Sequence, residues 1–329
     1  MIKPAVALAL ALFVSAVAQN LGDGRQRSAR TEKGAEDVID ENCQRQLEHS
    51  YFNYSTRLVA EERHTLSRGE VSTLDVEGSR NGGVSISGWD QPDVLVSACK
   101  FASAEDESTA QSLLKMLTVS TEGGRIRAVE PEGITDRKTS WSIQFTIFVP
   151  RDLPIEASVH NGGLSLRNLN GNVTGRSLNG GISLNESGSY QSLIKLRATN
   201  GGISLTDVQG RVTATTTNGG ISLTRGSGEV KLESQNGGIT VQLPEGGWVG
   251  ETLEATSQNG GMIVRVPQGF SSGIEAETSA HSRLDCRLPE CPQMQVESGR
   301  EPKRIQLGGP AAVVHLSTRN GVLQIAPPK

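Results

Sequence analysis

The chain has 329 residues, and its 38 glycines are well above the usual share of ~7%. Aromatic residues make up only 4%, which argues against a large core of bulky side chains, and the glycines are not spaced every third residue as collagen requires. Lys and Arg number 32 against 36 Asp and Glu, a formal net charge of −4, so the composition does not predict the basic face that nucleic-acid binding needs.

Residues 1–18 have the pattern of a signal peptide. They read MIKPAVALALALFVSAVA, with an apolar run of 14 residues and an Ala-Val-Ala cleavage motif at 16–18. The alternative is a membrane anchor, but a spanning helix needs about 20 apolar residues. We therefore expect export to the periplasm, the outer surface or the extracellular space, and no transmembrane span in the mature chain.

Residues 19–50 are expected to form a disordered tether and a short helical cap. The segment 19–35 is polar and almost without large apolar residues, and a weak helical pattern runs from Glu36 to about Glu48. Three aromatic residues follow within 51–54, and they favour a packed cap, with a ligand-binding patch as the alternative. A single β-solenoid repeat domain is then expected over 51–329.

Short strands and one helix are predicted before the regular repeats begin. Residues 71–76 and 84–86 alternate apolar and polar side chains, as does the segment 141–149. Between them, 104–117 has polar N-capping residues followed by apolar residues on one helical face. This helix should interrupt the strands and cover an open side or end of them.

The strongest signal is an internal repeat over 160–266. The tripeptide Asn-Gly-Gly (NGG), followed by an apolar residue, recurs at spacings of 18, 21, 18, 18 and 23 residues in this block. Each copy leads into an alternating strand. The copies begin at Asn81, Asn161, Asn179, Asn200, Asn218, Asn236 and Asn259, with a degenerate copy at Asn320.

Two architectures can use this repeat, an antiparallel meander and a solenoid. Val212, Ala214, Ile221 and Leu223 would share one face, and a flat meander would leave that face uncovered. Coiling turns it inward, so we predict an all-β fold, a parallel β-solenoid. The corner glycines are then expected to have positive φ, and the asparagines to form an amide ladder between coils about 4.8 Å apart.

The repeats resemble the bacterial putative-adhesin family of β-strand-repeat proteins of unknown function. The matching residues are the NGG copies, residues 78–90 (GSRNGGVSISGWD) and Phe148-Val149-Pro150. The resemblance covers about 65–325, including the helical insertion and the Gly247-Trp248 element. It implies an adhesive role and brings no catalytic residues, and the cysteine-bearing stretch 280–303 departs from its pattern.

The four cysteines, Cys43, Cys99, Cys286 and Cys291, suggest disulfides in an exported chain. Cys286 and Cys291 enclose four residues with a proline that favours a turn, which leaves Cys43 to pair with Cys99. Two alternatives stay open: free thiols, and a zinc site that adds His281 to Cys286 and Cys291 but provides only three ligands.

The sequence offers few candidates for catalysis. The acids and histidines show no recurring pair, and no nucleophile or phosphate-binding motif appears, so no catalytic, cofactor or metal residues are assigned. Outward positions carry hydroxyls instead, at Thr213, Thr215, Thr217, Ser222 and Thr224. We therefore predict a non-catalytic adhesin or cell-envelope scaffold whose partner is a cell-surface component or polysaccharide. The alternative is a polysaccharide lyase or hydrolase built on a β-helix.

Overall fold

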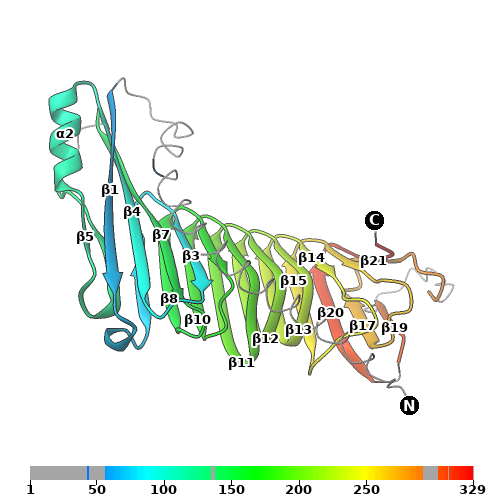
Figure 1. Ribbon diagram of the computed structural model, residues 1–329. Helices are drawn as coiled ribbons and strands as arrows, with labels where there is room; N and C mark the ends of the chain where they lie inside the picture. Colours follow the sequence, from blue (N-terminus) through cyan, green and yellow to red (C-terminus); the bar gives the residue numbers. More distant parts are fainter. Residues whose placement is uncertain (1–42, 44–55, 135–137, 292–302, 310, 329) are drawn as a thin grey trace, which may run out of the picture. The chain divides into compact units, whose positions relative to one another are not determined.

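The computed structural model describes residue 43 and residues 56–134, 138–291, 303–309 and 311–328 (Figure 1). The chain divides into two compact units, Met1–Tyr51 and Phe52–Lys329. The expected signal peptide, the tether and the aromatic cap lie outside the described residues, apart from Cys43. The described part of the second unit is almost entirely β-structure, and its parallel coils confirm the predicted β-solenoid.

The NGG corner divides each coil into two strand segments, which stack on their counterparts in two parallel ladders. The ladder that follows the corners runs through β7 (Ser140–Pro150), β3 (Val84–Trp89), β9 (Leu164–Arg167), β11 (Ile182–Asn200), β12 (Ile203–Asn218), β13 (Ile221–Asn236), β14 (Ile239–Gln242), β16 (Met262–Arg265), β21 (Val322–Ala326) and β18 (Arg283–Cys286).

The ladder that precedes the corners contains the later halves of the three long strands. In stacking order it runs through β6 (Arg125–Val129), β2 (Leu74–Glu77), β8 (Ile155–Asn161), β10 (Val173–Asn179), β11, β12, β13, β15 (Leu253–Asn259), β20 (Ala312–Asn320) and β17 (Gly273–Thr278).

Aliphatic side chains fill the interior of the coils. Val212, Ala214, Ile221 and Leu223 are all at most 2% exposed, as the alternation predicted. Equivalent residues stack in register from coil to coil, for example Ile203, Ile221 and Ile239. Each fully buried aliphatic side chain contributes about 1.5–3 kcal/mol, so the repeated column supplies most of the driving force for coiling.

Antiparallel strands and a helix cover the N-terminal end of the stack. β1 (Thr56–Leu66) pairs with β4 (Val94–Ala104), and β4 pairs with β7. The predicted helix is present as α2 (Glu107–Met116). Asp106 caps its N-terminus and accepts a hydrogen bond from the Thr109 N–H at 2.9 Å. The N-terminal part also contains η1 (Arg68–Glu70), β5 (Thr118–Ser120) and η2 (Glu122–Gly124).

At the C-terminal end, the strands stack in an order that differs from their order in the sequence. After β16 the chain first builds the outermost strands, β17 and β18, and β19 (Lys303–Leu307) then pairs with β17 in antiparallel fashion. The last strands, β20 and β21, return to lie between this outer layer and the coil of β15 and β16. The cysteine-bearing stretch therefore contributes to the terminal coil. No helix within the described residues is long and apolar enough to span a membrane.

Candidate binding groove

The repeated asparagines form a continuous ladder along the NGG corner. Each side-chain amide donates from Nδ2 to Oδ1 of the asparagine on the preceding coil, at 2.8–3.0 Å. All seven predicted asparagines take part, and the degenerate copy Asn320 extends the ladder from Asn259 although 61 residues separate them in the chain. The side chains are exposed, so the ladder runs along the outer edge of the coils.

The two glycines of each corner lie in different surroundings. A Cβ on the first glycine, as at Gly162 or Gly219, would overlap the backbone carbonyl of the preceding coil. On the second glycine a Cβ would lie 3.9 Å from the next carbonyl at Gly163 and 3.0 Å at Gly220. The expected positive φ is wrong for both rows, because the described glycines with positive φ all lie elsewhere. Close backbone approach explains the first row, and neither φ nor severe overlap explains the second.

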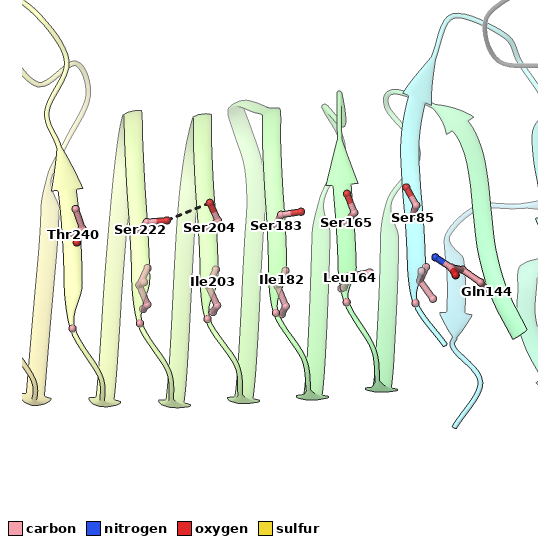
Figure 2. A pocket seen from close by; sticks show the side chains of 18 residues that line it. Ser85, Gln144, Leu164, Ser165, Ile182, Ser183, Ile203, Ser204, Ser222 and Thr240 are labelled. Carbon is pink, nitrogen blue, oxygen red and sulfur yellow. Dashed lines mark hydrogen bonds between the residues drawn. The ribbon is translucent and has the colours of Figure 1, made fainter. Parts of the chain in front are cut away.

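The second glycines line an open groove of about 930 Å³ that crosses successive coils. One wall is a row of hydroxyl side chains, one per coil, two residues after each of these glycines (Figure 2). The row comprises Ser85, Ser165, Ser183, Ser204, Ser222 and Thr240. Figure 2 shows them projecting from neighbouring strands, with the Ser222 hydroxyl donating to that of Ser204 at 3.2 Å.

The side-chain-free strip has a boundary at each end. In the strand register, Gln144 of β7 lies beside Gly83 at the N-terminal end of the strip. Val322 of β21 lies beside Gly261 at the other end. Gln144 lines the groove, and Val322 is 46% exposed where a second glycine would otherwise stand. The open strip therefore extends over the coils between these two residues.

The lining of the groove is uncharged and contains no carboxylate. At the far corner, Asn168, Glu186, Asp207 and Arg225 have left-handed φ values of 48–56°, and three of the four are charged. There the Arg225 guanidinium donates to both carboxylate oxygens of Asp207 at 2.6 and 2.7 Å, and these hydrogen bonds hold the pKa of Asp207 below its usual range. Asp207 is thus a stabilised carboxylate in an ion pair.

The predicted Ser/Thr wall is split between two faces of the solenoid. Thr213 and Thr215 lie on the ladder before the corner, whereas Ser222 lies after it. Of the five residues predicted for the wall, only Ser222 lines the groove. The single wall expected from the sequence is therefore wrong, because the corner at 218–220 separates the two segments.

The sequence reasoning missed a buried row of hydroxyls two residues before the asparagines. These side chains donate to backbone carbonyls of the first corner glycines at 2.8–3.1 Å and so satisfy acceptors that the tight corner would otherwise bury unpaired. A Ser or Thr in this position recurs in the sequence and could have revealed the row. Its members are Ser177, Thr216, Ser234, Ser257 and Thr318.

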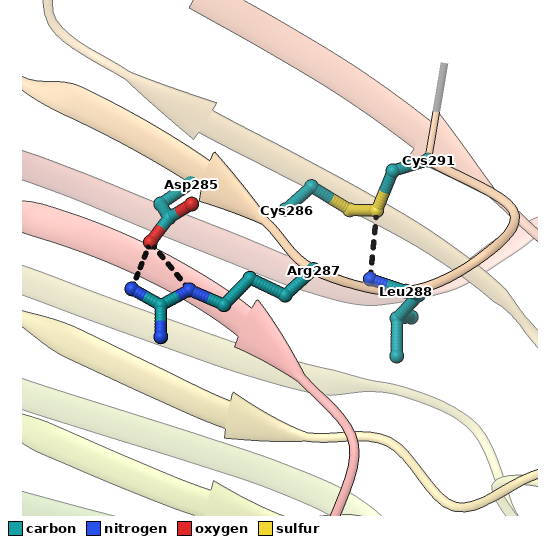
Figure 3. Close-up of a disulfide and its surroundings, with 5 residues drawn as sticks. All are labelled: Asp285, Cys286, Arg287, Leu288 and Cys291. Atoms are coloured by element: carbon teal, nitrogen blue, oxygen red, sulfur yellow. Dashed lines mark hydrogen bonds and ion pairs between the residues drawn. A yellow bond between two sulfur atoms is a disulfide. The ribbon is translucent and has the colours of Figure 1, made fainter. Parts of the chain in front are cut away.

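A disulfide joins Cys286 to Cys291, with Cα atoms 5.9 Å apart, and the Leu288 N–H donates to Cys291 Sγ (Figure 3). The zinc alternative is therefore wrong, because sulfurs bonded to each other are not available as thiolate ligands. Cys43 and Cys99 are also disulfide-bonded, and no cysteine of the described residues is free. Their assignment to each other stays a prediction. No cluster of three or more potential metal-ligating side chains occurs within the described ranges.

The coils, the amide ladder and the groove define a repetitive β-solenoid with an elongated open face. Residues 108–284 match the model of the Toastrack DUF4097 family, more than half of the sequence, and the chain belongs to that family. No curated protein matches the chain.

Two solved structures align with most of the chain. One is a putative cell adhesion protein from Clostridium sporogenes ATCC 15579, with 13% identity and a TM-score of 0.30, over 82% of this chain and 100% of the other. The second is a putative adhesin from Bacteroides fragilis NCTC 9343, with 9% identity and a TM-score of 0.37, over 84% of this chain and 100% of the other.

Proposed function

We propose that the chain is an exported, non-catalytic adhesin or cell-envelope scaffold that holds a surface polysaccharide along the groove. The observation that carries this proposal is the pairing of a hydroxyl row with a side-chain-free glycine strip over successive coils. Neighbouring parallel strands are about 4.8 Å apart, so the hydroxyls offer hydrogen bonds at a regular interval to an extended, hydroxyl-rich polymer.

A groove of this kind favours binding through many weak contacts. Each hydroxyl exchanges a hydrogen bond to water for one to the polymer, which gains little by itself. Repetition along one rigid surface raises the total affinity, because later contacts form at high effective concentration. Since the lining is uncharged, this binding should depend little on salt.

The alternative, a polysaccharide lyase or hydrolase, receives no support from the groove. Hydrolysis of a glycosidic bond generally needs a pair of carboxylates beside the bond, one of them with a raised pKa. The groove lining has no acid, and Asp207 at the far corner has a lowered pKa. A rigid strip of glycine backbone and hydroxyls fits retention of a polymer better than its cleavage.

Export is supported by the cysteine chemistry. Disulfides persist in oxidising compartments, and all four cysteines are disulfide-bonded. Together with the leader pattern of residues 1–18, this favours a site of action outside the cytoplasm. Mass spectrometry of the N-terminus after cell fractionation tests it, and a protein that keeps residues 1–18 in the cytoplasm would contradict it.

The binding proposal is tested by deleting two whole coils. Removal of residues 201–236 joins Asn200 to Gly237 in the same repeat phase and takes Ser204 and Ser222 out of the row. We expect the wild type to bind a neutral polysaccharide in a pull-down panel, the deletion variant to lose at least tenfold in affinity, and Ser204→Ala to change little.

Two measurements make this test decisive. The melting temperature (Tm) of each variant establishes that it folds, and product analysis records whether the polysaccharide is cleaved. Equal binding by the folded deletion variant would contradict the groove, and new reducing ends abolished by one carboxylate substitution would establish the enzyme instead.

A further inference from the structure

A cluster of unpaired cations lies on the strands that precede the NGG corner. Arg176 on β10 and Arg197 on β11 are direct neighbours in the parallel register, and Lys195 lies two residues before Arg197. All three are exposed and alternate with buried residues, so their side chains project outward from the same face. This face is distinct from the groove, whose lining lies on the strands after the corner.

Three cations on the next coils have acidic partners, but these three do not. Arg211 pairs with Glu229 at 2.6 Å, Arg225 with Asp207 at 2.6 Å, and Lys231 with Glu233 at 2.9 Å. Among the described residues, no ion pair or hydrogen bond involves the side chains of Arg176, Lys195 or Arg197.

The neighbours of the cluster are mostly uncharged hydroxyls. Arg176 lies beside Ser158 on one side, Arg197 beside Thr215 on the other, and Lys195 between Thr174 and Thr213. Like charges on adjacent strands destabilise a sheet, so the fold alone gives no reason for two arginines side by side. An external anion would remove that repulsion.

The coil that contains Lys195 and Arg197 also has an exposed aromatic side chain, that of Tyr190. The repeat from Asn179 to Asn200 has 21 residues, against 18 in its neighbours, and the register breaks between Gly188 and Leu193. This extra loop carries Tyr190, which is 69% exposed, the highest value among the large apolar side chains in the described ranges.

Hydrogen bonds fix the loop that carries Tyr190. The Ser192 hydroxyl donates to the Asn170 carbonyl at 2.6 Å and accepts from the Ser189 N–H at 2.9 Å. The Leu193 N–H donates to Asn172 Oδ1 at 2.9 Å. The ring is thus presented on a fixed platform at the start of the strand segment that carries Lys195 and Arg197.

We propose that Arg176, Lys195, Arg197 and Tyr190 form a second binding surface, for an acidic polysaccharide. Guanidinium groups bind carboxylate or sulfate groups through paired, charge-assisted hydrogen bonds, and a tyrosine ring packs on the flat apolar face of a sugar. The net charge of −4 over the whole chain disfavours general attraction to polyanions, so recognition depends on this local cluster.

The test compares two double variants of equal charge. Arg176→Gln with Arg197→Gln removes the neighbouring pair, whereas Arg167→Gln with Arg283→Gln removes two exposed arginines elsewhere. We expect the wild type to bind polygalacturonate or heparin in a salt-dependent manner, and the first variant to bind at least tenfold more weakly, because each lost guanidinium removes a charge-assisted contact. The second should stay within about a factor of two. Comparison of the carboxylated probe, polygalacturonate, with the sulfated probe, heparin, shows which of the two anionic groups the cluster binds.

Further measurements separate recognition from folding. Tm of the first variant should equal or exceed that of the wild type, because a like-charge contact is lost. Tyr190→Ala should weaken binding, and Tyr190→Phe should retain it. Equal weakening by both double variants, unchanged binding by the first, or equal affinity for duplex DNA would overturn the proposal. The double variant Arg176→Gln with Arg197→Gln leaves every residue of the groove lining in place, so failure of the groove and failure of the cluster give different results.

Discussion

The NGG corner and the far corner of each coil both depend on glycine, but for different physical reasons. At the far corner Gly188, Gly210 and Gly228 have φ values of 97–113°, a backbone conformation that side chains disfavour. At the NGG corner no glycine has positive φ, and the first glycine is required because two backbones approach closely. A regular spacing of glycine in a repeat therefore does not by itself identify a left-handed turn.

The three residues of each NGG corner have different roles. The asparagine bonds to the coils on both sides, and the first glycine lets those coils pack at the strand spacing. The second glycine has room for a Cβ at Gly163 and Gly181, whereas the nearest carbonyl lies 3.0–3.2 Å from the Cβ position on the other coils, so packing does not account for it along the whole row. Its place in the groove lining is the basis of the binding role that we propose for it.

The largest effect is expected from Gly162→Ala. The new Cβ would overlap the Gly82 carbonyl, which is held in the backbone and cannot move without separating the coils. We expect a loss of about 3 kcal/mol or more in the free energy of unfolding, measured by chemical denaturation. Gly163→Ala, one residue later, has 3.9 Å of clearance and should stay within about 1 kcal/mol of the wild type.

A third variant separates close approach from backbone conformation. Gly246 has a φ of 80°, and no atom lies within 4 Å of the position that a Cβ would take there. Gly246→Ala should therefore cost only about 1 kcal/mol, the conformational penalty alone. Equal losses for Gly162→Ala and Gly163→Ala would contradict the distinction between the two rows.

A smaller effect is expected from the amide ladder. Asn200 bonds to both Asn179 and Asn218, whereas Asn320 at the end bonds only to Asn259. Asn200→Ala should therefore cost about 1–2 kcal/mol and Asn320→Ala about half as much, since each exposed hydrogen bond contributes modestly. Thr199→Ala is the control. Identical losses at the two asparagines would show that the ladder does not act through pairwise bonds.

Much of the fold can be predicted from the sequence because the same pattern of apolar residues, asparagines and glycines recurs in each coil. The alternation of Val212, Ala214, Ile221 and Leu223 places the interior correctly, and the asparagine spacing predicts the ladder. The helix is identifiable from its apolar face and the polar residues before it, but it begins later than predicted, because Ala104 still belongs to β4 and Asp106 is the N-cap.

The groove could not be predicted in the same way. Periodicity distinguishes inward from outward residues, but it does not say on which side of a corner an outward residue lies, so it groups Thr215 and Ser222 in one wall. Glycine identity likewise does not reveal whether φ or close approach requires it. The return of β20 to the coil of β15 depends on long-range packing, which local patterns do not contain.

The most direct test of the account is to fill the groove without disturbing the coils. Gly163→Phe places a large side chain at a position that lines the groove and has room for a Cβ. The measurement is the affinity for a neutral polysaccharide, compared with Gly163→Ala in proteins of verified Tm. We predict that Gly163→Ala binds like the wild type, and that Gly163→Phe melts near it but binds at least tenfold more weakly. Full binding by folded Gly163→Phe would contradict the assignment of the groove as the binding surface.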